Sequence, residues 1–333
     1  MRERSKSGIV TLEYLDKYQD MPHKTMAKLM HKERPKLFVT LEQARSSIRY
    51  YKGRNGTRNR GELAVRDYAL PAPTEDNPHS LPLAEDENFK PYIVGPTQDR
   101  VLVLADIHIP HHDVHALTLA LQVGKDFGAN TIILNGDFLD MHSLSSFVKD
   151  PEAADLPKEL EMGRHMLYAI RKQFPDAKII MKEGNHEDRM GRYLSNKAPE
   201  LLRLTECRLD VLLRLMDVGA DWVDRKQPIY FGHLNILHGH EMAGAGSSVN
   251  PARSMYLKAM ACVLSAHNHQ TSQQVGKTLR DTNITCWTQG ALCQLHPQFM
   301  PYNKWNLGFT LLERTDGDNF MLYPKRIING EVC

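Results

Sequence analysis

The chain has 333 residues, of which 41% are hydrophobic and 25% are charged, as expected for a soluble globular protein with a substantial core. No apolar run is long enough to span a bilayer, and the first residues, MRERSKSG, lack the apolar region of a signal peptide. We therefore expect no membrane partner and a cytoplasmic location. The five cysteines are odd in number and contain no Cys-x-x-Cys pair, which argues against a disulfide framework and a thiolate zinc site.

The formal net charge of +2 conceals an uneven distribution along the chain. Residues 1–70 contain 16 Lys and Arg against 8 Asp and Glu, a net charge of +8, so the remainder carries −6. A basic segment favours a polyanionic partner, and an acidic body is compatible with a cation site rich in carboxylates. A solvated basic arm without a specific partner is the alternative.

Three short helices are predicted in the basic segment. Helical apolar spacing covers residues 11–20, with Thr11 as the expected N-cap, and a second helix fits residues 23–33. A third begins after Thr40, which is followed three residues later by Gln43 in the capping-box arrangement. We expect an all-α N-terminal domain.

These helices resemble a helix-turn-helix module whose third helix is the recognition element. The resemblance implies binding to nucleic acid, with DNA as the expected partner, and the basic bias continues into YKGRNGTRNR, which suits phosphate contacts. A small helical bundle that contacts the rest of the chain or another protein is the alternative. The candidate nucleic-acid contacts are Arg45, Arg49, Lys52, Arg54, Arg58 and Arg60.

A Pro- and acid-rich stretch without periodicity separates this segment from the rest of the chain. We therefore predict a basic helical domain at residues 1–70, a linker at 71–99 and a catalytic domain at 100–333.

From residue 100 onward, strand-like apolar runs alternate with helical stretches, which predicts an α/β fold. The helices are expected near residues 115–127 and 157–174, with a further helical insertion at 198–217. The C-terminal third contains strand-like runs that we expect to close a second sheet as antiparallel strands. The five main strand candidates are 101–106, 131–136, 178–184, 234–239 and 261–267.

Each of these five strand candidates ends at or next to an Asp, Asn or His, and ligands bind beyond the carboxyl ends of strands in open α/β sheets. Only oxygen and nitrogen donors stand there, which favours borderline divalent ions. If the chain stayed extended beyond the first strand, positions i and i+2 would face the same side. The strand ends read Asp106-x-His108, Gly136-Asp137-x-x-Asp140, Gly184-Asn185-His186-Glu187, His238-Gly239 and His267-Asn268-His269.

This series is similar to the motifs of the calcineurin-like metallophosphoesterase superfamily, over about residues 100–315. The resemblance implies a two-sheet β-sandwich flanked by helices and hydrolysis of phosphate esters with two divalent ions. Manganese is the first expectation, and iron, nickel and zinc are alternatives. One ion would be held by Asp106, His108, Asp137 and His269. The other would be held by Asp137, Asn185, His238 and His267.

The resemblance also implies that two cations polarise the phosphoryl group and activate a water for in-line attack. His186 would then act as general acid at the leaving group, and Asp140 would orient its ring.

The sequence departs from the family pattern at Ala266, where the family usually has glycine. The fourth block also offers two histidines, of which His238 fits the family position directly after the apolar strand. His240 is then a candidate substrate contact, with a purely structural histidine as the alternative.

Two arginines are further candidates for binding substrate phosphate. Arg189 follows His186 by three residues, and Arg253 lies between the last two motif blocks. A surface salt bridge is the alternative for Arg189, and a charge on the surface of a helix is the alternative for Arg253. His296, Tyr302 and Trp305 are expected at the rim of the site or, alternatively, in the core.

The substrate is not fixed by the fold. The basic N-terminal segment favours a phosphodiesterase or nuclease acting on nucleic acid. A phosphomonoesterase acting on phosphoproteins or small phosphate esters is the second hypothesis, although the Arg-Gly of the protein-phosphatase pattern is replaced by Met141-His142. An inactive DNA-binding or adaptor protein is the third, and no motif ligand is missing to support it. The sequence leaves the oligomeric state open.

Overall fold

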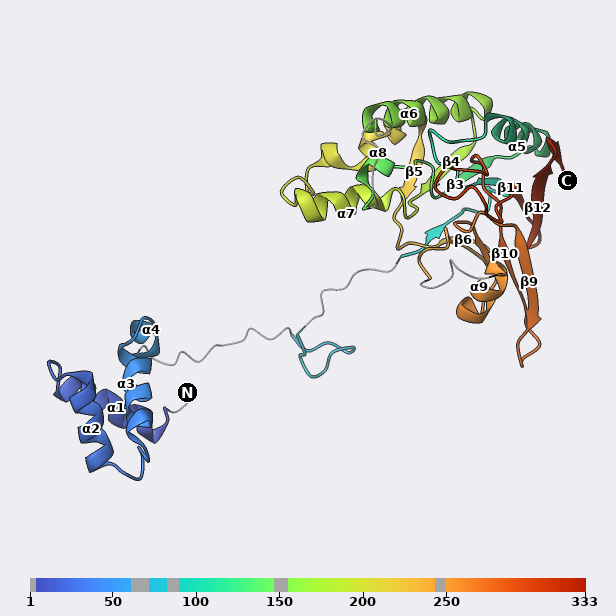
Figure 1. Cartoon of the computed structure of the whole chain (residues 1–333). Helices are drawn as coiled ribbons and strands as arrows, with labels where there is room; N and C mark the ends of the chain where they lie inside the picture. Colours follow the sequence, from blue (N-terminus) through green and yellow to red (C-terminus); the bar gives the residue numbers. More distant parts are fainter. Residues whose placement is uncertain (1–3, 61–71, 83–89, 147–154, 243–248) are drawn as a thin grey trace. The chain divides into compact units, whose positions relative to one another are not determined.

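The computed structural model describes residues 4–60, 72–82, 90–146, 155–242 and 249–333. The chain divides into two units, Met1–Asp86 and Glu87–Cys333, each with its own core (Figure 1). Within the described ranges, each helix is too short or too polar to cross a membrane.

The N-terminal unit is a small helical domain, as the sequence predicted. Its core lies between the first three helices and includes Met26, Met30, Phe38 and Ile48, each at most 1% exposed. The described helices are α1 (Lys6–Lys17), α2 (His23–Glu33), α3 (Leu41–Lys52) and the short α4 (Gly56–Arg60).

The helix starts test the capping predictions directly. The capping box before α3 is confirmed, because the Thr40 side chain accepts from the Gln43 N–H and the Gln43 side chain accepts from the Thr40 N–H. The predicted start at Thr11 is wrong. Ser5 caps α1 by accepting from the Gly8 N–H, and Thr11 is buried inside the helix. Its hydroxyl lies 2.7 Å from both the Ser7 carbonyl and the Ser47 hydroxyl, so it joins α1 to α3.

In the C-terminal unit, seven described strands form one sheet in the order β13-β12-β11-β2-β3-β4-β5. Its parallel half, β2 to β5, is apolar on both faces because helices cover one side and the second sheet covers the other. The strands are β2 (Arg100–Leu104), β3 (Thr131–Asn135), β4 (Lys178–Lys182), β5 (Ala220–Val223), β11 (Leu307–Arg314), β12 (Phe320–Ile328) and β13 (Glu331–Val332).

Six described strands form the second sheet in the order β1-β6-β7-β8-β10-β9. They are β1 (Tyr92–Ile93), β6 (Ile229–Phe231), β7 (Leu234–Ile236), β8 (Val263–Ser265), β9 (Ser272–Lys277) and β10 (Asn283–Thr288). The C-terminal runs were expected to close a second sheet together, but β11 and β12 extend the first sheet beside β2, whereas β9 and β10 join the second.

The two sheets pack face to face over an apolar core. Val103 and Ile133 from the first sheet meet Phe231, Ile236 and Leu264 from the second, all at most 1% exposed. Fully burying side chains of this size contributes about 1.5–3 kcal/mol each. The predicted β-sandwich is thereby confirmed, and its edge holds the loops that follow the strands.

Helices cover the outer faces of both sheets (Figure 1). Helices α5 (Val114–Phe127) and α6 (Leu156–Gln173) pack on the first sheet, close to their predicted limits, and α9 (Pro251–Ala259) packs on the second. Helix α7 (Asp188–Lys197) follows β4.

The predicted helical insertion at 198–217 is not one helix. It contains short turns only: η2 (Thr205–Cys207), α8 (Leu209–Leu212) and the start of η3 (Leu215–Val218). Arg214 has a φ of 53°, which stops helical propagation between α8 and η3. A further single turn, η1 (His142–Leu144), follows β3.

The linker predicted at 71–99 contains an ordered strand at its C-terminal end. Tyr92 and Ile93 pair in parallel with Ile229 and Tyr230, and the second unit begins at Glu87. The alternation of apolar and polar residues is too short there to reveal a two-residue strand whose partner lies more than 130 residues away.

Candidate active site

The polar strand ends of both sheets meet at one edge of the sandwich. Strands β2, β3 and β4 run parallel in the first sheet, and β7 and β8 run parallel in the second. Each strand stops before its first candidate ligand, for example at Leu104, two residues before Asp106. The candidate ligands therefore stand on the loops that follow the strands.

The backbone at these loops is left-handed, not extended. Asp106, His108, Asp137, His267 and His269 all have φ between 51° and 67°. The chain does not stay extended beyond β2, so the condition for the expected i and i+2 arrangement of Asp106 and His108 is not met. Non-glycine residues in this region cost on the order of 1–3 kcal/mol each, and such strain persists at sites that the surrounding structure determines.

The loops hold one another in this conformation. The Asp106 N–H donates to the Gly136 carbonyl at 3.2 Å, and the His108 N–H donates to the Asp137 carbonyl at 2.9 Å. Gly136 has a φ of 83°, and a Cβ there would lie 2.4 Å from His238 Nδ1. Only glycine fits this position, since both the conformation and the space exclude a side chain.

One group of donors gathers around His108 and His269. Their Nε2 atoms lie 3.1 Å apart, His269 Nε2 lies 3.5 Å from Asp106 Oδ1, and His108 Nε2 lies 3.8 Å from Asp137 Oδ2. All four residues are buried, at most 7% exposed. Both Asp106 oxygens also accept from the His267 N–H, at 3.2 and 3.0 Å, which fixes the carboxylate.

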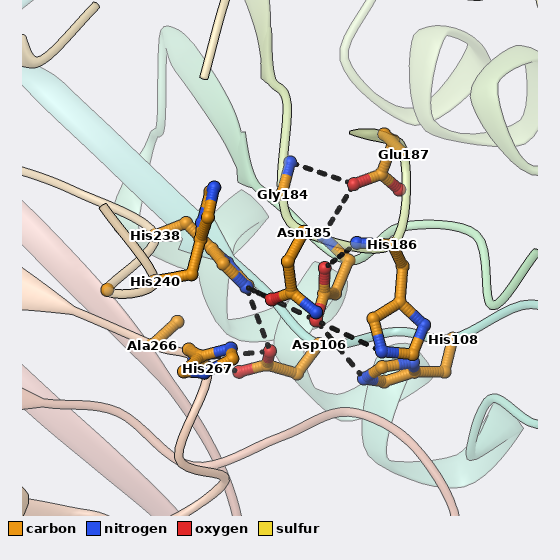
Figure 2. A network of polar contacts seen from close by, with 12 residues as sticks. Asp106, His108, Gly184, Asn185, His186, Glu187, His238, His240, Ala266 and His267 are labelled. Carbon is orange, nitrogen blue, oxygen red and sulfur yellow. Dashed lines mark hydrogen bonds and ion pairs between the residues drawn. The ribbon is translucent and has the colours of Figure 1, made fainter. Parts of the chain in front are cut away.

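A second group shares Asp137. His238 Nε2 lies 3.2 Å from both Asp137 Oδ2 and Asn185 Oδ1, and His267 completes a cluster with Asp137 and His238. His238 Nδ1 lies 2.8 Å from the carbonyl of Asn135, so the ring donates there and presents Nε2 to the carboxylate. Figure 2 shows the side chains of Asn185, His238 and Asp106 turned toward one another.

The electrostatics of the site fit bound cations. Burial raises the pKa of Asp137, but His186 and His238 outweigh burial and hold it well below its usual range. The pKa of Asp106 is also lowered, since His269 and His238 act against burial. Two ionised carboxylates at most 1% exposed need nearby positive charge, and the convergent oxygen and nitrogen donors match borderline divalent ions.

Asp140 connects two histidines at the mouth of the site. Its Oδ1 lies 3.2 Å from Nδ1 of both His108 and His186, and its carbonyl lies 2.8 Å from His186 Nδ1. Burial lowers the pKa of His186, but Asp137 and Asp140 outweigh burial and raise it. Arg189 donates to the Asp140 carbonyl at 2.7 Å, and its Nη2 lies 3.0 Å from His186 Nε2.

The other two predicted substrate contacts, His240 and Arg253, do not line the cavity at the strand ends, although the His240 ring centre lies 5.4 Å from that of His238 and 6.3 Å from that of His267. His240 lines a separate cavity of about 690 Å³, where burial lowers its pKa to about 4, and its ring points away from Asp106 in Figure 2. Arg253 is exposed on α9 and does not line the cavity at the strand ends. Ala266 does not have a positive φ, and its N–H donates to the His238 carbonyl at 2.8 Å, so alanine is tolerated in place of glycine.

Glu187 is a structural residue of the site to which the sequence analysis gave no role. It is 1% exposed, and its carboxylate accepts from the N–H groups of Asp137, Leu139 and Gly184, each at 2.9 Å. These bonds join the loop after β3 to the loop after β4 (Figure 2). The sequence feature that could have revealed this role is the position of Glu187 directly after His186 in the third motif.

Lys182 and Glu241 were also missed. Lys182 is fully buried on β4 and lies 3.0 Å from Glu241 Oε1, and Glu241 accepts from the N–H groups of His238 and Gly239. Burial raises the pKa of Glu241, but Lys182 and His238 lower it to about 2. A lysine within an apolar strand was the signal that could have revealed this pair.

The cavity at the strand ends has a volume of about 820 Å³. Besides His108, Asp137 and His186 it is lined by Cys293, whose sulfur lies within 4.8 Å of ligating nitrogens of His108 and His269. Burial raises the pKa of the Cys293 thiol, and neighbouring carboxylates raise it further.

Comparison with known proteins assigns this fold and site to a class. The profile of the calcineurin-like phosphoesterase family matches residues 99–271. The Gene 54 protein of Mycobacterium phage L5 is 24% identical over 177 residues, which cover 51% of this chain and 69% of that protein.

Among solved structures, a single mutant of Vps29 from Entamoeba histolytica is 14% identical, with a TM-score of 0.36, and the match covers 70% of this chain and 96% of that one. Yfce, a phosphoesterase from E. coli, is 15% identical, with a TM-score of 0.33 and coverage of 64% and 88%.

The chain belongs to the calcineurin-like phosphoesterase family. It is therefore a metal-dependent hydrolase of phosphoric esters, and the His and Asp groups at the strand ends are candidates for binding its divalent metals.

Proposed function

We propose that the protein hydrolyses phosphodiester bonds of nucleic acid with two divalent ions, and that its N-terminal unit binds that nucleic acid. The proposal of hydrolysis rests on one observation: two groups of donors share the buried Asp137 carboxylate. The basic surface of α3 supports the nucleic-acid part.

In this proposal, one ion is held by Asp106, His108, Asp137 and His269, and the other by Asp137, Asn185, His238 and His267. Manganese is the first candidate, and iron, nickel and zinc suit the same donors. Two divalent ions held by these residues would supply Lewis-acid polarisation of the phosphoryl group and a water of lowered pKa for in-line attack.

The protein's own contribution at the leaving group is assigned to His186 and Asp140. Asp140 holds Nδ1 of the His186 ring through its carboxylate and its carbonyl, so Nε2 is the nitrogen available to protonate the leaving oxygen. Arg189 Nη2 lies 3.0 Å from that Nε2. Because an arginine can only donate a hydrogen bond, this contact requires that His186 Nε2 carries no proton. Arg189 must therefore release His186 before proton transfer, and in doing so it becomes free to pair with a substrate phosphate.

Nucleic-acid binding is assigned to the exposed face of α3 and the residues after it. Arg49, Tyr50 and Lys52 are exposed there, whereas the half-buried Arg45 forms an ion pair with Glu42. Arg49 also contacts Glu42, so a phosphate would compete with one carboxylate for two arginines. Arg54 and Arg60 are exposed beyond α3, while the side chain of Arg58 and residues 61–70 lie outside the described part of the chain.

The reaction is tested with p-nitrophenyl phosphate and bis-p-nitrophenyl phosphate in parallel, each with manganese. We expect a higher kcat/KM with the diester. A clear preference for the monoester would instead support a phosphatase, and purified protein that binds DNA but hydrolyses neither ester with manganese, iron, nickel or zinc would support an inactive adaptor.

Nucleic-acid binding by the N-terminal unit is tested by the salt dependence of DNA binding. The variant Arg49→Gln/Lys52→Gln should bind duplex DNA more weakly, and the slope of log K against log salt should fall by about 0.9 for each lost phosphate contact. Arg280→Gln removes an exposed charge from the β9–β10 turn and serves as the matched control. Equal slopes for all three proteins would contradict the role of α3.

A further inference from the structure

The cavity at the strand ends has a second wall that contains none of the candidate metal ligands. This wall comes from the segment between β10 and β11, and it consists of Gln294, His296, Pro297, Gln298, Phe299 and Trp305. Among the described residues that line the cavity, none is Lys or Arg. The wall therefore suits a neutral group of the substrate better than a second phosphate.

Two aromatic rings lead outward from the candidate metal centre along this wall. The Trp305 ring lies 4.2 Å from the His269 ring, centre to centre, at an angle of 62°. The Phe299 ring lies 6.3 Å from Trp305 and is 79% exposed. A planar group attached to a phosphate at the strand ends would meet these rings first.

The segment is organised before any ligand arrives. The Asn303 side chain donates to the carbonyls of Leu295 and Met300, at 2.6 and 2.9 Å, and accepts from the Trp305 N–H at 2.9 Å. The next residue, Asn306, donates its N–H to the His269 carbonyl at 2.9 Å. Trp305 is thereby fixed relative to a candidate metal ligand, so a group that stacks on it loses little in ordering the protein.

We propose that Trp305 and Phe299 form a stacking surface for the nucleobase next to the scissile phosphate, an inference that rests on the proposed function. Aromatic side chains stack on every base because every base has a π-face. The amides of Gln294 and Gln298, both exposed at the same cavity, supply donors and acceptors for the edge of the ring. The stacking surface narrows the proposed substrates to diesters that carry a base on the side of the phosphate away from the leaving group.

The test compares two diesters with the same leaving group: the p-nitrophenyl ester of thymidine 5′-monophosphate and methyl p-nitrophenyl phosphate. Trp305→Ala should raise KM about 10-fold for the thymidine ester and leave the methyl ester unchanged. Phe299→Ala should act in the same direction with a smaller effect, and because Phe299 is exposed this variant should fold normally. Trp305→Phe, which keeps a ring, should restore much of the loss.

Tyr302→Ala is the matched control. Tyr302 is 96% exposed on the same segment and does not line the cavity, so its removal should change neither KM. An equal rise in KM for both esters in Trp305→Ala would mean that the ring only supports His269 or holds the leaving group, and would overturn the proposal. Unchanged kinetics for both esters in Trp305→Ala and Phe299→Ala would overturn it as well.

A binding experiment separates this inference from the proposed function. If the protein hydrolysed neither diester, calorimetry of the manganese-loaded protein with thymidine 5′-monophosphate and with methyl phosphate would still test the stacking surface. We expect thymidine 5′-monophosphate to bind at least about 10-fold more tightly, and Trp305→Ala to abolish the difference. Equal affinities of the two ligands for the unsubstituted protein would refute the stacking surface even if hydrolysis were intact.

Discussion

The buried ion pair between Lys182 and Glu241 should decide whether the His238 loop keeps its position. Lys182 is 0% exposed, donates to the Gln227 carbonyl at 2.7 Å and lies 3.0 Å from Glu241 Oε1. Glu241 in turn accepts from the N–H groups of His238 and Gly239, at 3.0 and 2.6 Å. The lysine on β4 therefore supports the loop after β7 through one carboxylate.

Lys182→Met keeps the aliphatic part of the side chain and removes its charge, which leaves the Glu241 carboxylate buried without its cation. Breaking a buried pair by removing one partner costs about 3–5 kcal/mol. For a domain of this size each kcal/mol lowers Tm by roughly 2–4 °C, so we expect a fall of about 6–20 °C. The double variant Lys182→Met/Glu241→Gln has no unpaired charge, and its amide oxygen can still accept a backbone N–H. It should recover most of the loss.

Differential scanning calorimetry in the presence of EDTA measures the protein's own stability without contributions from bound metal. Lys182→Met, Glu241→Gln and the double variant complete a double-mutant cycle with the unsubstituted protein. If the double variant were as unstable as Lys182→Met, the destabilisation would come from the carbonyls of Asp224, Arg225 and Gln227, which lose the Lys182 ammonium as donor, and not from the uncompensated carboxylate. The reasoning about the ion pair would then be refuted.

Three further substitutions test the site. Asp137→Asn should lose both metals because one carboxylate serves both groups, and elemental analysis that finds full occupancy would contradict the shared ligand. His186→Ala should keep its metals but lose about 10²–10⁴-fold in turnover of alkyl esters, with a smaller loss for p-nitrophenyl esters. Burial raises the pKa of Glu159 to about 7, so the unsubstituted protein should lose up to about 3 kcal/mol relative to Glu159→Gln as pH rises from 5 to 8. The Met141 N–H still has an oxygen acceptor in that variant, and a stability difference independent of pH between the two proteins would contradict the raised pKa.

The candidate ligands could be located from the sequence because each stands within a few residues of the end of an apolar run. A run such as VLVL before Asp106 predicts a buried strand, and parallel strands that end together bring their next residues together. The Thr40 cap of α3 was predictable for a similar reason, since its two hydrogen bonds span three residues of sequence.

Features that depend on distant partners could not be predicted in this way. The sheet to which β11 belongs is set by its pairing with β2, about 200 residues earlier in the chain. Thr11 could serve as an N-cap by its chemistry, but Ser5 lies earlier and the hydroxyl of Thr11 is used in the contact with Ser47 on α3. The type of side chain alone does not show whether a threonine hydroxyl caps its own helix or contacts a neighbouring one.

The left-handed backbone of the ligand loops could not be predicted from the pattern of apolar and polar residues either. An extended chain would have placed Asp106 and His108 on one side, yet both residues turn at φ of 51° and accommodate Gly136 and Asp137 from the neighbouring loop. Five of the left-handed residues carry side chains that converge at the site, while the strands beneath them are regular and buried. The sandwich core and carboxylates such as Glu187 therefore hold a local conformation that these loops would not adopt by themselves.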